Sequence, residues 1–446
     1  MRVEIKEHKL FQKILKKRQI NISDKIINGI SIDSRLIQKG DIFLPLKGES
    51  SDGHDFIKDA FKNGASYIFS EKSSKKSEYI IKVDSVYEFL LQVASDLRTY
   101  FKYPFIGITG SNGKTTTKEL LVNILSSKYN IVYTKDNYNS TIGVPISLFQ
   151  FELNADFAIV EMGASKPGEI KKICKIVKPD IALITNISDA HIEYFKTIKE
   201  VQKTKSALFT SLPPDGLAFI NVDDNYISEL SPNCKTIKFS FNNSDADYVG
   251  MWTSDNNFNN IAINGTNIKL PYSSEVFGKN VLSAFSIAKE IGININDIAK
   301  QVKTFNNPKG RCEILKTNDL TIINDSYNSN LASAISGLKY LMSYRTSGRK
   351  IVVIGDMFEL GDLGIKHHKE LGKKLDKLKP DAVFAIGSLS KHIIGAMKNF
   401  SSFKMHFSNK DSLQIELRKY VENNDVIYIK GSRGMKMEKI LNIFKI

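Results

Sequence analysis

The chain has 446 residues, of which 42% are hydrophobic and 25% are charged. This composition is typical of a globular protein and excludes a disordered or fibrous one, and the length requires two or three domains. The three cysteines lie far apart without a CxxC pair, which argues against a zinc ribbon or a disulfide framework and indicates a reducing compartment. The net charge of +15 suits anionic partners, although lysines spread along the whole chain explain it without any functional meaning.

The amino-terminal segment gives no sign of export or membrane insertion. Residues 1–20 contain no apolar run of about seven residues or more, so a cleaved signal peptide is not expected. No stretch approaches the roughly 20 apolar residues of a membrane-spanning helix. We therefore expect a cytoplasmic protein that does not enter a membrane.

Residues 1–103 predict a small α/β domain. Short strands are expected at 42–46, 67–69 and 79–83, and a helix is expected at 86–100. Pro104 ends this block, because the residue before a proline is pushed out of the helical conformation.

Residues 104–308 predict a central domain in which strands and helices alternate. Strands are expected at 105–109, 156–161 and 180–185, with helices at 116–126 and 168–177. This alternation is typical of a doubly wound, mostly parallel sheet. The polar stretches 242–247 and 253–260 predict hairpin turns and loops.

Residues 309–446 repeat the alternation and predict a Rossmann-like α/β domain. Strands are expected at 320–324, 350–354, 382–386 and 426–430, and helices begin near Leu331 and Lys366. The sequence therefore predicts three α/β domains, with boundaries near residues 103 and 308.

The segment 109–116, TGSNGKTT, predicts a phosphate-binding loop in the central domain. It stands between a strand and a helix, as such a loop requires, although Ile108 replaces the first glycine of the usual P-loop pattern. The two glycines let the backbone turn its N–H groups toward phosphate, Lys114 would reach the β- and γ-phosphates, and Thr115 would bind Mg²⁺. A glycine turn followed by a lysine is the alternative. The expected nucleotide-binding residues of the loop are Gly110, Ser111, Asn112, Gly113, Lys114, Thr115 and Thr116.

Two side chains that follow neighbouring predicted strands suggest a magnesium site. Glu161 ends the strand 156–161, and His191 follows the strand 180–185. Ligands gather beyond the carboxyl ends of strands in open α/β sheets, so both could reach the Mg²⁺–triphosphate. The alternatives are a solvated charge for Glu161 and a structural role for His191.

Lys205 lies on the apolar stripe of a predicted helix, because Ile198, Val201 and Leu208 share its face. A lysine on a buried face must find an anion or change its chemistry, or its stem must extend to bring the amine to solvent. Periodicity alone does not separate these alternatives.

These motifs together resemble the Mur ligase family, the ATP-dependent amide-forming enzymes of peptidoglycan synthesis. Residues 109–115 resemble the family's TGxNGKT loop, and residues 186–191 resemble NIxxAH, with Ser188 where glycine is common. Lys205 falls where the family has a carbamylated lysine, whose added carboxylate can hold Mg²⁺. The resemblance implies ATP and two Mg²⁺ ions, with Thr115, Glu161, His191 and carbamylated Lys205 as metal ligands.

Four further motifs resemble those members that join D-alanyl-D-alanine to UDP-N-acetylmuramoyl-tripeptide, the last cytoplasmic step of the peptide stem. They are NxNNxxGVP at 137–145, DxYNAN at 325–330, GDMxELG at 355–361 and KGSRG at 430–434. The DNPR signature of the ligase that adds the third residue is absent. The resemblance implies substrate contacts from Asn137, Asn139, Tyr327, Asn328 and Asn330.

The amino-terminal block resembles the family's nucleotide-sugar domain at residues 32–35, 40–48 and 52–54. This implies that Ser34 and Arg35 help to hold the UDP part of the substrate. A turn with a helix cap is the alternative for both residues.

Two positions depart from the family pattern. Leu331 replaces the proline that often follows DxYNAN. Residues 277–280 only loosely resemble the GxHN segment, which contacts adenine, so the adenine contact implied for Asn280 rests on a partial match.

The resemblance implies that ATP converts a carboxylate into an acyl phosphate, which the amine of the dipeptide then attacks. Lys114, His191 and Lys205 would act in catalysis by neutralising the charge of the transferring phosphoryl group, directly or through Mg²⁺. Arg311 and Asp325 would reach the nucleotide after the last domain closes over the central one.

Rival interpretations remain at this point. One is another ligase of the superfamily, such as a folylpolyglutamate synthase or the tripeptide-forming Mur ligase. A second is a basic P-loop ATPase that binds nucleic acid, but the basic stripe or base-stacking motif that it needs is missing. A third is a non-catalytic nucleotide-binding module. We expect a monomer without a nucleic-acid partner, and the sequence leaves lysine and diaminopimelate open as the third stem residue.

Overall fold

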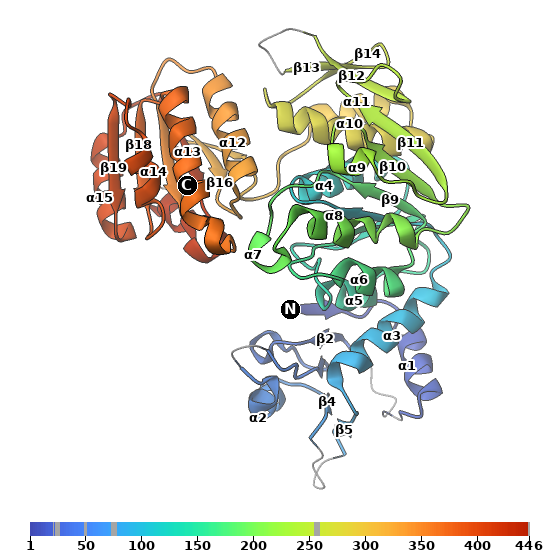
Figure 1. Ribbon diagram of the computed structural model, residues 1–446. Coiled ribbons are helices and arrows are strands. Elements are labelled where there is room, and N and C mark those ends of the chain that lie inside the picture. The colour runs from blue at the N-terminus through green and yellow to red at the C-terminus, as the bar shows by residue number, and fades with distance from the viewer. Residues whose placement is uncertain (21, 23–26, 49–50, 73–77, 254–258, 445–446) are drawn as a thin grey trace.

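The computed structural model describes residues 1–20, 22, 27–48, 51–72, 78–253 and 259–444. These residues form sheets of five, nine and six strands, one in each of three consecutive blocks. In Figure 1 the carboxyl-terminal block (orange and red) lies beside the middle block (green and yellow), and the amino-terminal block (blue) lies below the middle one. The predicted α/β class is confirmed. Within the described residues, no helix has the length and hydrophobicity needed to cross a membrane.

The amino-terminal block contains a five-stranded sheet in which only the first pair is antiparallel. The strand order is β1-β2-β3-β4-β5. Two strands are shorter than the sequence predicts, whereas the predicted helix 86–100 is confirmed. The elements are β1 (Arg2–Glu4), α1 (His8–Lys17), β2 (Gly29–Ser31), β3 (Ile42–Phe43), α2 (Ile57–Lys62), β4 (Tyr67–Ser70), β5 (Ile80–Lys82) and α3 (Val86–Tyr100).

The amino-terminal and middle blocks share one hydrophobic core. The ring of Phe11 on α1 packs edge-on against Phe149 of the middle block, with centroids 5.7 Å apart. Arg98, near the end of α3, donates through its guanidinium to the carbonyl oxygens of Val177 and Lys178. Helix α3 therefore joins the two blocks through both apolar and polar contacts.

The middle sheet has the strand order β14-β13-β12-β11-β10-β9-β6-β8-β7. All of its neighbouring pairs are parallel except β12–β13 and β13–β14. The strands are β6 (Phe105–Thr109), β7 (Ile131–Tyr133), β8 (Phe157–Glu161), β9 (Ile181–Ile184), β10 (Leu217–Asn221), β11 (Lys235–Ser240), β12 (Tyr248–Trp252), β13 (Asn260–Ile263) and β14 (Thr266–Lys269).

The two polar stretches of the middle block differ in what they connect. The strands β12 and β13, on either side of residues 253–259, are antiparallel, as in a hairpin, and residues 254–258 lie outside the described residues. Residues 242–247 link the parallel strands β11 and β12, so of the predicted hairpin turns and loops this stretch is a loop and not a hairpin. Ser240 Oγ accepts hydrogen bonds from the backbone N–H groups of residues 242 and 243, which turns the chain out of the sheet. The polar composition indicated a loop, but it did not indicate whether the next strand runs parallel or antiparallel to the one before.

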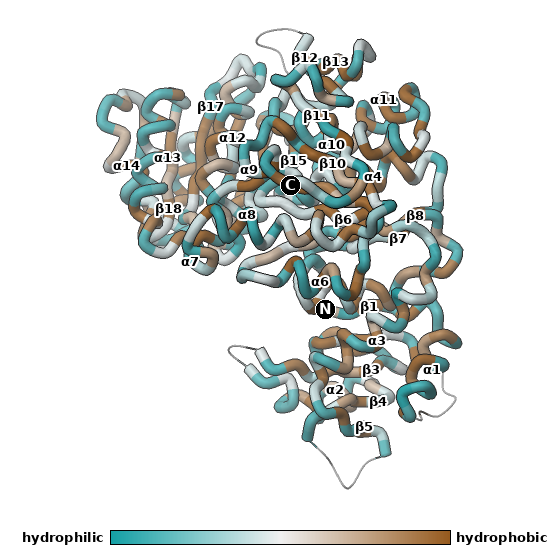
Figure 2. The backbone as a smooth tube through the Cα atoms, turned by 45° about the vertical axis from the view of Figure 1, so that its right-hand side comes forward, coloured by the Kyte–Doolittle hydropathy of each residue, from teal (hydrophilic) through white to brown (hydrophobic). Residues whose placement is uncertain are grey.

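Helices cover both faces of the middle sheet, as a doubly wound fold requires. Alternate residues of β6 point to opposite faces: Ile106 and Ile108 lie in the core beneath α4, α10 and α11, and Phe105 lies in the core shared with α3 and α6. Figure 2 shows hydrophobic segments (brown) in the strands around β6. The helices are α4 (Lys114–Leu125), α5 (Gly143–Ser147), α6 (Glu169–Val177), α7 (Ile192–Phe195), α8 (Ile198–Ser206), α9 (Asn225–Ser228), α10 (Glu275–Glu290) and α11 (Ile295–Lys303).

The carboxyl-terminal sheet has the order β15-β16-β20-β17-β18-β19, and only β15 is antiparallel to its neighbour. The helix expected from Lys366 begins two residues earlier, and the predicted strand 382–386 is confirmed. The elements are β15 (Glu313–Lys316), β16 (Thr321–Asp325), α12 (Leu331–Ser343), β17 (Lys350–Gly355), α13 (Gly364–Leu378), β18 (Ala382–Ile386), α14 (Lys391–Ala396), β19 (Phe403–Phe407), α15 (Lys410–Tyr420) and β20 (Val426–Lys430).

Gly337 on α12 makes room for Tyr428, whose buried hydroxyl donates to Asp325 Oδ2 at 2.9 Å. A Cβ atom at position 337 would overlap the Tyr428 hydroxyl, whereas a Cβ at Gly395 on α14 would meet nothing within 4 Å. We expect Gly337→Ala to lower the free energy of unfolding by about 1–3 kcal/mol. Gly395→Ala is the matched control and should be neutral or stabilise by up to about 1 kcal/mol. Urea unfolding of both variants checks this, and equal stabilities would contradict it.

Candidate active site

The segment 109–116 lies where three strand ends of the middle sheet meet. Strand β6 pairs with β8 on one side and with β9 on the other, so the loop after β6 has Glu161 on one flank and residues 185–191 on the other. The chain reverses its direction of winding at β6, which is the point where open α/β sheets bind ligands. The predicted neighbourhood of the loop, Glu161 and His191 is confirmed.

Left-handed backbone at both loop glycines shapes the loop, with φ of 149° at Gly110 and 82° at Gly113. A Cβ at Gly110 would overlap Thr185 Oγ1, which donates to the carbonyl oxygen of Asn112 at 2.6 Å. The backbone N–H of Ser111 donates to Asn186 O at 2.8 Å. Helix α4 begins directly after Gly113, and the first N–H groups of a helix have no partner inside it. They form a binding site for a phosphate group.

Two lysines converge on one backbone carbonyl of this loop. Nζ of Lys114 and Nζ of Lys205 donate to Gly110 O at 2.7 and 3.1 Å. Burial lowers the pKa of Lys114 to about 8. Burial, together with the nearby charge of Lys114, lowers the pKa of Lys205 well below its ordinary value. Lys205 is only 2% exposed, so the alternative in which its amine extends to solvent is wrong.

Glu161 is buried, with 1% of its surface exposed, so the solvated alternative is wrong for this residue. Its Oε1 accepts hydrogen bonds from Thr115 Oγ1 at 3.0 Å and from Asn139 Nδ2 at 2.8 Å. Its Oε2 is buried without a hydrogen-bond partner. An unpartnered carboxylate oxygen in a buried site calls for a cation or a donor that the chain itself does not supply.

Lys118, a fully buried lysine one turn after Lys114 on α4, is not among the predicted site residues. Its Nζ donates to Thr134 O at 2.7 Å and pairs with Glu119, and Thr134 Oγ1 in turn accepts from the backbone N–H of Glu161. Lys118 therefore supports the strand end that positions Glu161. The apolar residues that follow it on α4 are the signal that could have revealed a buried lysine, by the periodicity applied to Lys205.

His191 lies at the junction of the middle and carboxyl-terminal blocks. It has left-handed backbone with φ of 56° and stands at the start of α7. Its Nδ1 forms an ion-pair contact with Glu359 Oε2 of the carboxyl-terminal block. The hydrogen bond and charge of His191 lower the pKa of the Glu359 carboxyl.

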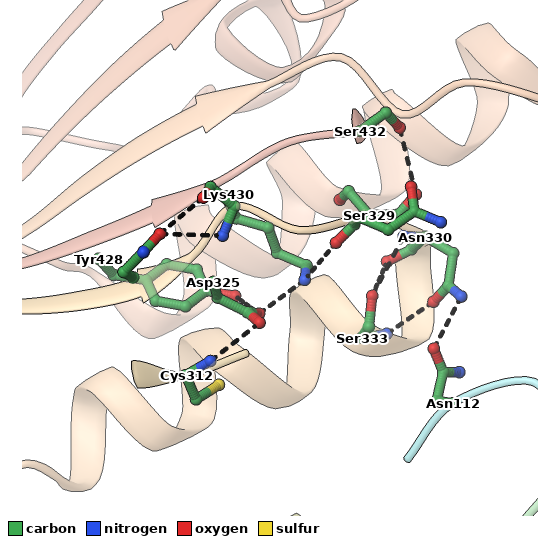
Figure 3. Close-up of polar contacts among 12 residues, drawn as sticks. Asn112, Cys312, Asp325, Ser329, Asn330, Ser333, Tyr428, Lys430 and Ser432 are labelled. Atoms are coloured by element: carbon green, nitrogen blue, oxygen red, sulfur yellow. Dashed lines mark hydrogen bonds and ion pairs between the residues drawn. The ribbon is translucent and has the colours of Figure 1, made fainter. Parts of the chain in front are cut away.

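The carboxyl-terminal block contributes a second polar cluster around Asp325 (Figure 3). Oδ2 of Asp325 accepts from Lys430 Nζ at 2.6 Å and from the Tyr428 hydroxyl at 2.9 Å. Asn330 caps the start of α12, and its Nδ2 donates to Asn112 Oδ1 of the phosphate loop at 2.9 Å. This amide contact ties the carboxyl-terminal block directly to the loop.

A cavity of about 650 Å³ opens between the middle and carboxyl-terminal blocks. Thr115 lies behind its wall, where it contacts Glu161. The Arg311 guanidinium, in the wall, stacks on the Tyr327 ring at 4.0 Å. The predicted site residues that line the cavity are Gly110, Ser111, Asn112, Gly113, Lys114, Thr116, Asn139, Glu161, His191, Lys205, Asn280, Arg311, Asp325, Tyr327, Asn328 and Asn330.

Three predicted substrate residues do not line this cavity. Ser34 and Arg35 belong to a 3₁₀ turn in which Asp33 accepts from the Arg35 backbone N–H, which is the cap that the alternative described. The Arg35 guanidinium pairs with Asp33, and most of its surface is exposed. Asn137 is exposed, and its carbonyl oxygen accepts from the Asn139 N–H.

The donors at these strand ends fit a hard divalent cation, for which carboxylate and hydroxyl oxygens are the preferred ligands. The unpartnered Oε2 of Glu161, the Thr115 hydroxyl and the His191 imidazole lie along the strand ends. Among the described residues, no three His, Cys, Asp or Glu side chains gather into a metal-binding group. A complete ligand set therefore needs a further donor, from a substrate or from a modified side chain.

This fold and site are those of a three-block ligase with a phosphate loop at the centre. Three family models match in chain order: the Mur ligase family catalytic domain over residues 26–96, the Mur ligase middle domain over 108–288 and the Mur ligase glutamate ligase domain over 310–433.

The UDP-N-acetylmuramoyl-tripeptide–D-alanyl-D-alanine ligase of Bacillus subtilis is 31% identical over 93% of both chains. The enzyme of the same name from Buchnera aphidicola of Acyrthosiphon pisum is 35% identical over 94% of this chain and 93% of its own. The crystal structure of MurF from Acinetobacter baumannii matches with a TM-score of 0.87, at 26% identity over 100% of both chains. MurF from Thermotoga maritima in complex with ADP matches with a TM-score of 0.81, at 27% identity over 93% of this chain and 96% of its own.

The chain therefore belongs to the Mur ligase family, and within it to the UDP-N-acetylmuramoyl-tripeptide–D-alanyl-D-alanine ligases.

Gly110 offers a direct test of the loop geometry. We expect Gly110→Ala to weaken ATP binding by roughly tenfold or more, because the added Cβ displaces Thr185 and strains the loop by about 1–3 kcal/mol. Calorimetric titration with ATP measures this, and Gly395→Ala on α14 is the control that should bind normally. An unchanged affinity in Gly110→Ala would show that the loop does not hold the nucleotide.

Proposed function

We propose that this chain is the ATP-dependent ligase that joins D-alanyl-D-alanine to UDP-N-acetylmuramoyl-tripeptide in peptidoglycan synthesis. The observation that supports it most is the convergence of Lys114, Glu161 and Lys205 at the phosphate loop, inside a cavity that the carboxyl-terminal block closes. Among the relatives, chains of this name match over nearly their whole length.

The proposed reaction begins with activation of the tripeptide's terminal carboxylate. A carboxylate is a poor electrophile, so ATP transfers its γ-phosphoryl group to it and ADP leaves. The free amine of D-alanyl-D-alanine then attacks the acyl phosphate, phosphate leaves, and an amide bond remains. Lys114 and the first N–H groups of α4 hold the triphosphate, and Arg311 approaches it from the carboxyl-terminal block.

Thr115, Glu161 and His191 would hold divalent cations, for which we propose Mg²⁺. Bound there, Mg²⁺ supplies neutralisation of the charge on the phosphoryl group. The chain's own contribution is to position the groups and exclude water, because the cavity lies between two blocks and a free acyl phosphate would hydrolyse.

We propose that Lys205 is carbamylated in the active enzyme. Only a neutral amine can add CO₂, and burial beside Lys114 favours the neutral form of Lys205. The product is a carboxylate, which would complete the ligand set that Glu161 and His191 leave open. The carbamate would also place a negative charge beside Lys114, where a protonated Lys205 would repel it.

The substrates would span the blocks. We propose that residues 1–103 hold the UDP part through Ser34 and Arg35, that residues 104–308 hold ATP with Asn280 near the adenine, and that residues 309–446 complete the site. Asn137, Asn139, Tyr327, Asn328 and Asn330 would contact the peptide portions. Since one chain supplies every one of these groups, we propose that it acts as a monomer, and ATP as substrate favours the cytoplasm as its compartment.

Amine-dependent release of phosphate tests the proposed function. With ATP, Mg²⁺ and UDP-N-acetylmuramoyl-tripeptide, D-alanyl-D-alanine should stimulate release, whereas glutamate or diaminopimelate offered as the amine should not. Tripeptides that end in lysine and in diaminopimelate are compared, which also identifies the third residue. Stimulation by glutamate instead would indicate another ligase of the superfamily.

Lys205→Ala tests the carbamate. We expect activity to fall by about a hundredfold or more, because one metal ligand is lost, and to recover partly when a short-chain carboxylate is added. Lys203→Ala is the matched control, since Lys203 lies on the same helix with its side chain 79% exposed. Full activity of Lys205→Ala without any added carboxylate would reject the role.

A further inference from the structure

The short helix α7 bridges the middle and carboxyl-terminal blocks (Figure 1). Ile192 is buried in the apolar core of the carboxyl-terminal block, whereas Phe195 is buried in the core that the other two blocks share. The backbone N–H of Glu193 donates to Glu359 O at 3.1 Å. Residues 191–195 thus dock into the carboxyl-terminal block through an apolar side chain, a backbone hydrogen bond and the His191–Glu359 contact.

The docking partner is the segment 355–361, whose GDMxELG pattern has no task in the reaction described above. Several contacts hold this segment in place. Oδ1 of buried Asp356 accepts from the backbone N–H groups of Leu389 and Ser390, and Met357 N–H donates to His368 Nε2 at 3.0 Å.

Glu359 itself has left-handed backbone with φ of 60°, and His191 across the interface has φ of 56°. Left-handed backbone at a residue other than glycine costs free energy, and it persists only where surrounding contacts hold it. Two such residues face each other here, and their side chains meet at His191 Nδ1. The contact therefore rests on fixed backbone at both ends.

A carboxylate on one nitrogen of an imidazole fixes the ring's tautomer and orientation and makes the other nitrogen a better ligand. In this chain that carboxylate would come from a different block than the imidazole. Nδ1 of His191 faces Glu359, which leaves Nε2 as the nitrogen available to a cation.

We propose that Glu359 is a positioning residue: it holds His191 in the tautomer and orientation that bind the metal, and it does so only while the carboxyl-terminal block is docked on α7. This inference rests on the proposed function, because it takes His191 as a metal ligand. It assigns a task to the segment 355–361, which is to make metal binding depend on the arrangement of the blocks. The middle block, which would hold ATP, would then gain its full metal affinity only after docking.

Glu359→Gln tests the proposal, because it keeps the size of the side chain and the backbone contact to Glu193 but removes the charge. Binding of MnCl₂ to the full chain with saturating ADP is measured by electron paramagnetic resonance. We expect the affinity of the His191 site to fall about 10–100-fold in Glu359→Gln and to recover partly in Glu359→Asp. Asp362→Asn is the matched control, since Asp362 is an exposed acid in the 3₁₀ turn that follows Glu359.

A double-mutant cycle separates positioning from a general structural effect. If Glu359 acts through His191, Glu359→Gln should weaken Mn²⁺ binding no further in a chain that already has His191→Ala. A second readout needs no metal: ¹⁵N spectra of the imidazoles at fixed pH should show His191 with its proton on Nδ1 in the parent chain and a mixture of tautomers in Glu359→Gln.

Three results would overturn the proposal: Mn²⁺ affinity in Glu359→Gln equal to that of the parent chain, additive losses in the double variant, or an unchanged tautomer. Phosphate release by the parent chain and by Asp362→Asn is measured beside these. If the parent chain lacks release stimulated by D-alanyl-D-alanine, the proposed function fails. If that release is present and Glu359→Gln binds Mn²⁺ normally, only the positioning role fails.

Discussion

Strand β6 pairs with β8 on one side and with β9 on the other, so the carboxyl ends of the three strands lie next to one another. The phosphate loop, Glu161 and the segment that leads to His191 all follow these strand ends. The loop after β6 has no freedom to move away, since Thr185 and Asn186 hold its backbone from the neighbouring strand end. Glu161 is equally fixed by Thr115 and Asn139. A rigid frame of this kind suits a reaction in which positioning contributes most of the rate acceleration.

The same frame places two lysine amines in a buried environment. Lys114 and Lys205 donate to one carbonyl oxygen. Burial lowers the pKa of both amines, and the charge of Lys114 lowers that of Lys205 further. Such an arrangement costs stability in the absence of an anionic partner, and it is typical of functional sites rather than of structural cores. A triphosphate brings the missing negative charge. The chain without ligand is therefore less stable than it could be, because its site is already arranged to bind an anion.

Local patterns in the sequence were sufficient for the strands and loops that form the site. The strand at 105–109, the glycine turn after it and the place of Lys205 on an apolar helix face follow from spacing and residue type within a short stretch. Burial of the Lys205 amine itself did not follow from that pattern. The periodicity of α4 could have placed Lys118 on a buried face, but its hydrogen-bond partner Thr134 follows a different strand and could not be inferred locally. Glu359 was recognised as part of a motif, but nothing local shows that it reaches His191, since that contact depends on how two blocks dock.

The substrate contacts predicted in the amino-terminal block did not follow from local patterns. The turn at Ser34 and Arg35 does not line the cavity and has the cap of an ordinary 3₁₀ turn. Resemblance alone suggested a role for these residues. The periodicity of apolar residues could not predict a substrate contact for them, because it reports which side chains are buried in the fold and not which ones touch a substrate.

The shared core around α3 has a consequence for how the molecule denatures. Phe11 packs on Phe149, and Arg98 is bonded to the carbonyl groups that end α6, so the first two blocks cannot separate without exposing a common apolar interior. The last block has its own interior and meets the others mainly through α7 and polar side chains. On heating, the chain therefore behaves as two cooperative units, one of about two thirds of its length and one formed by the remainder.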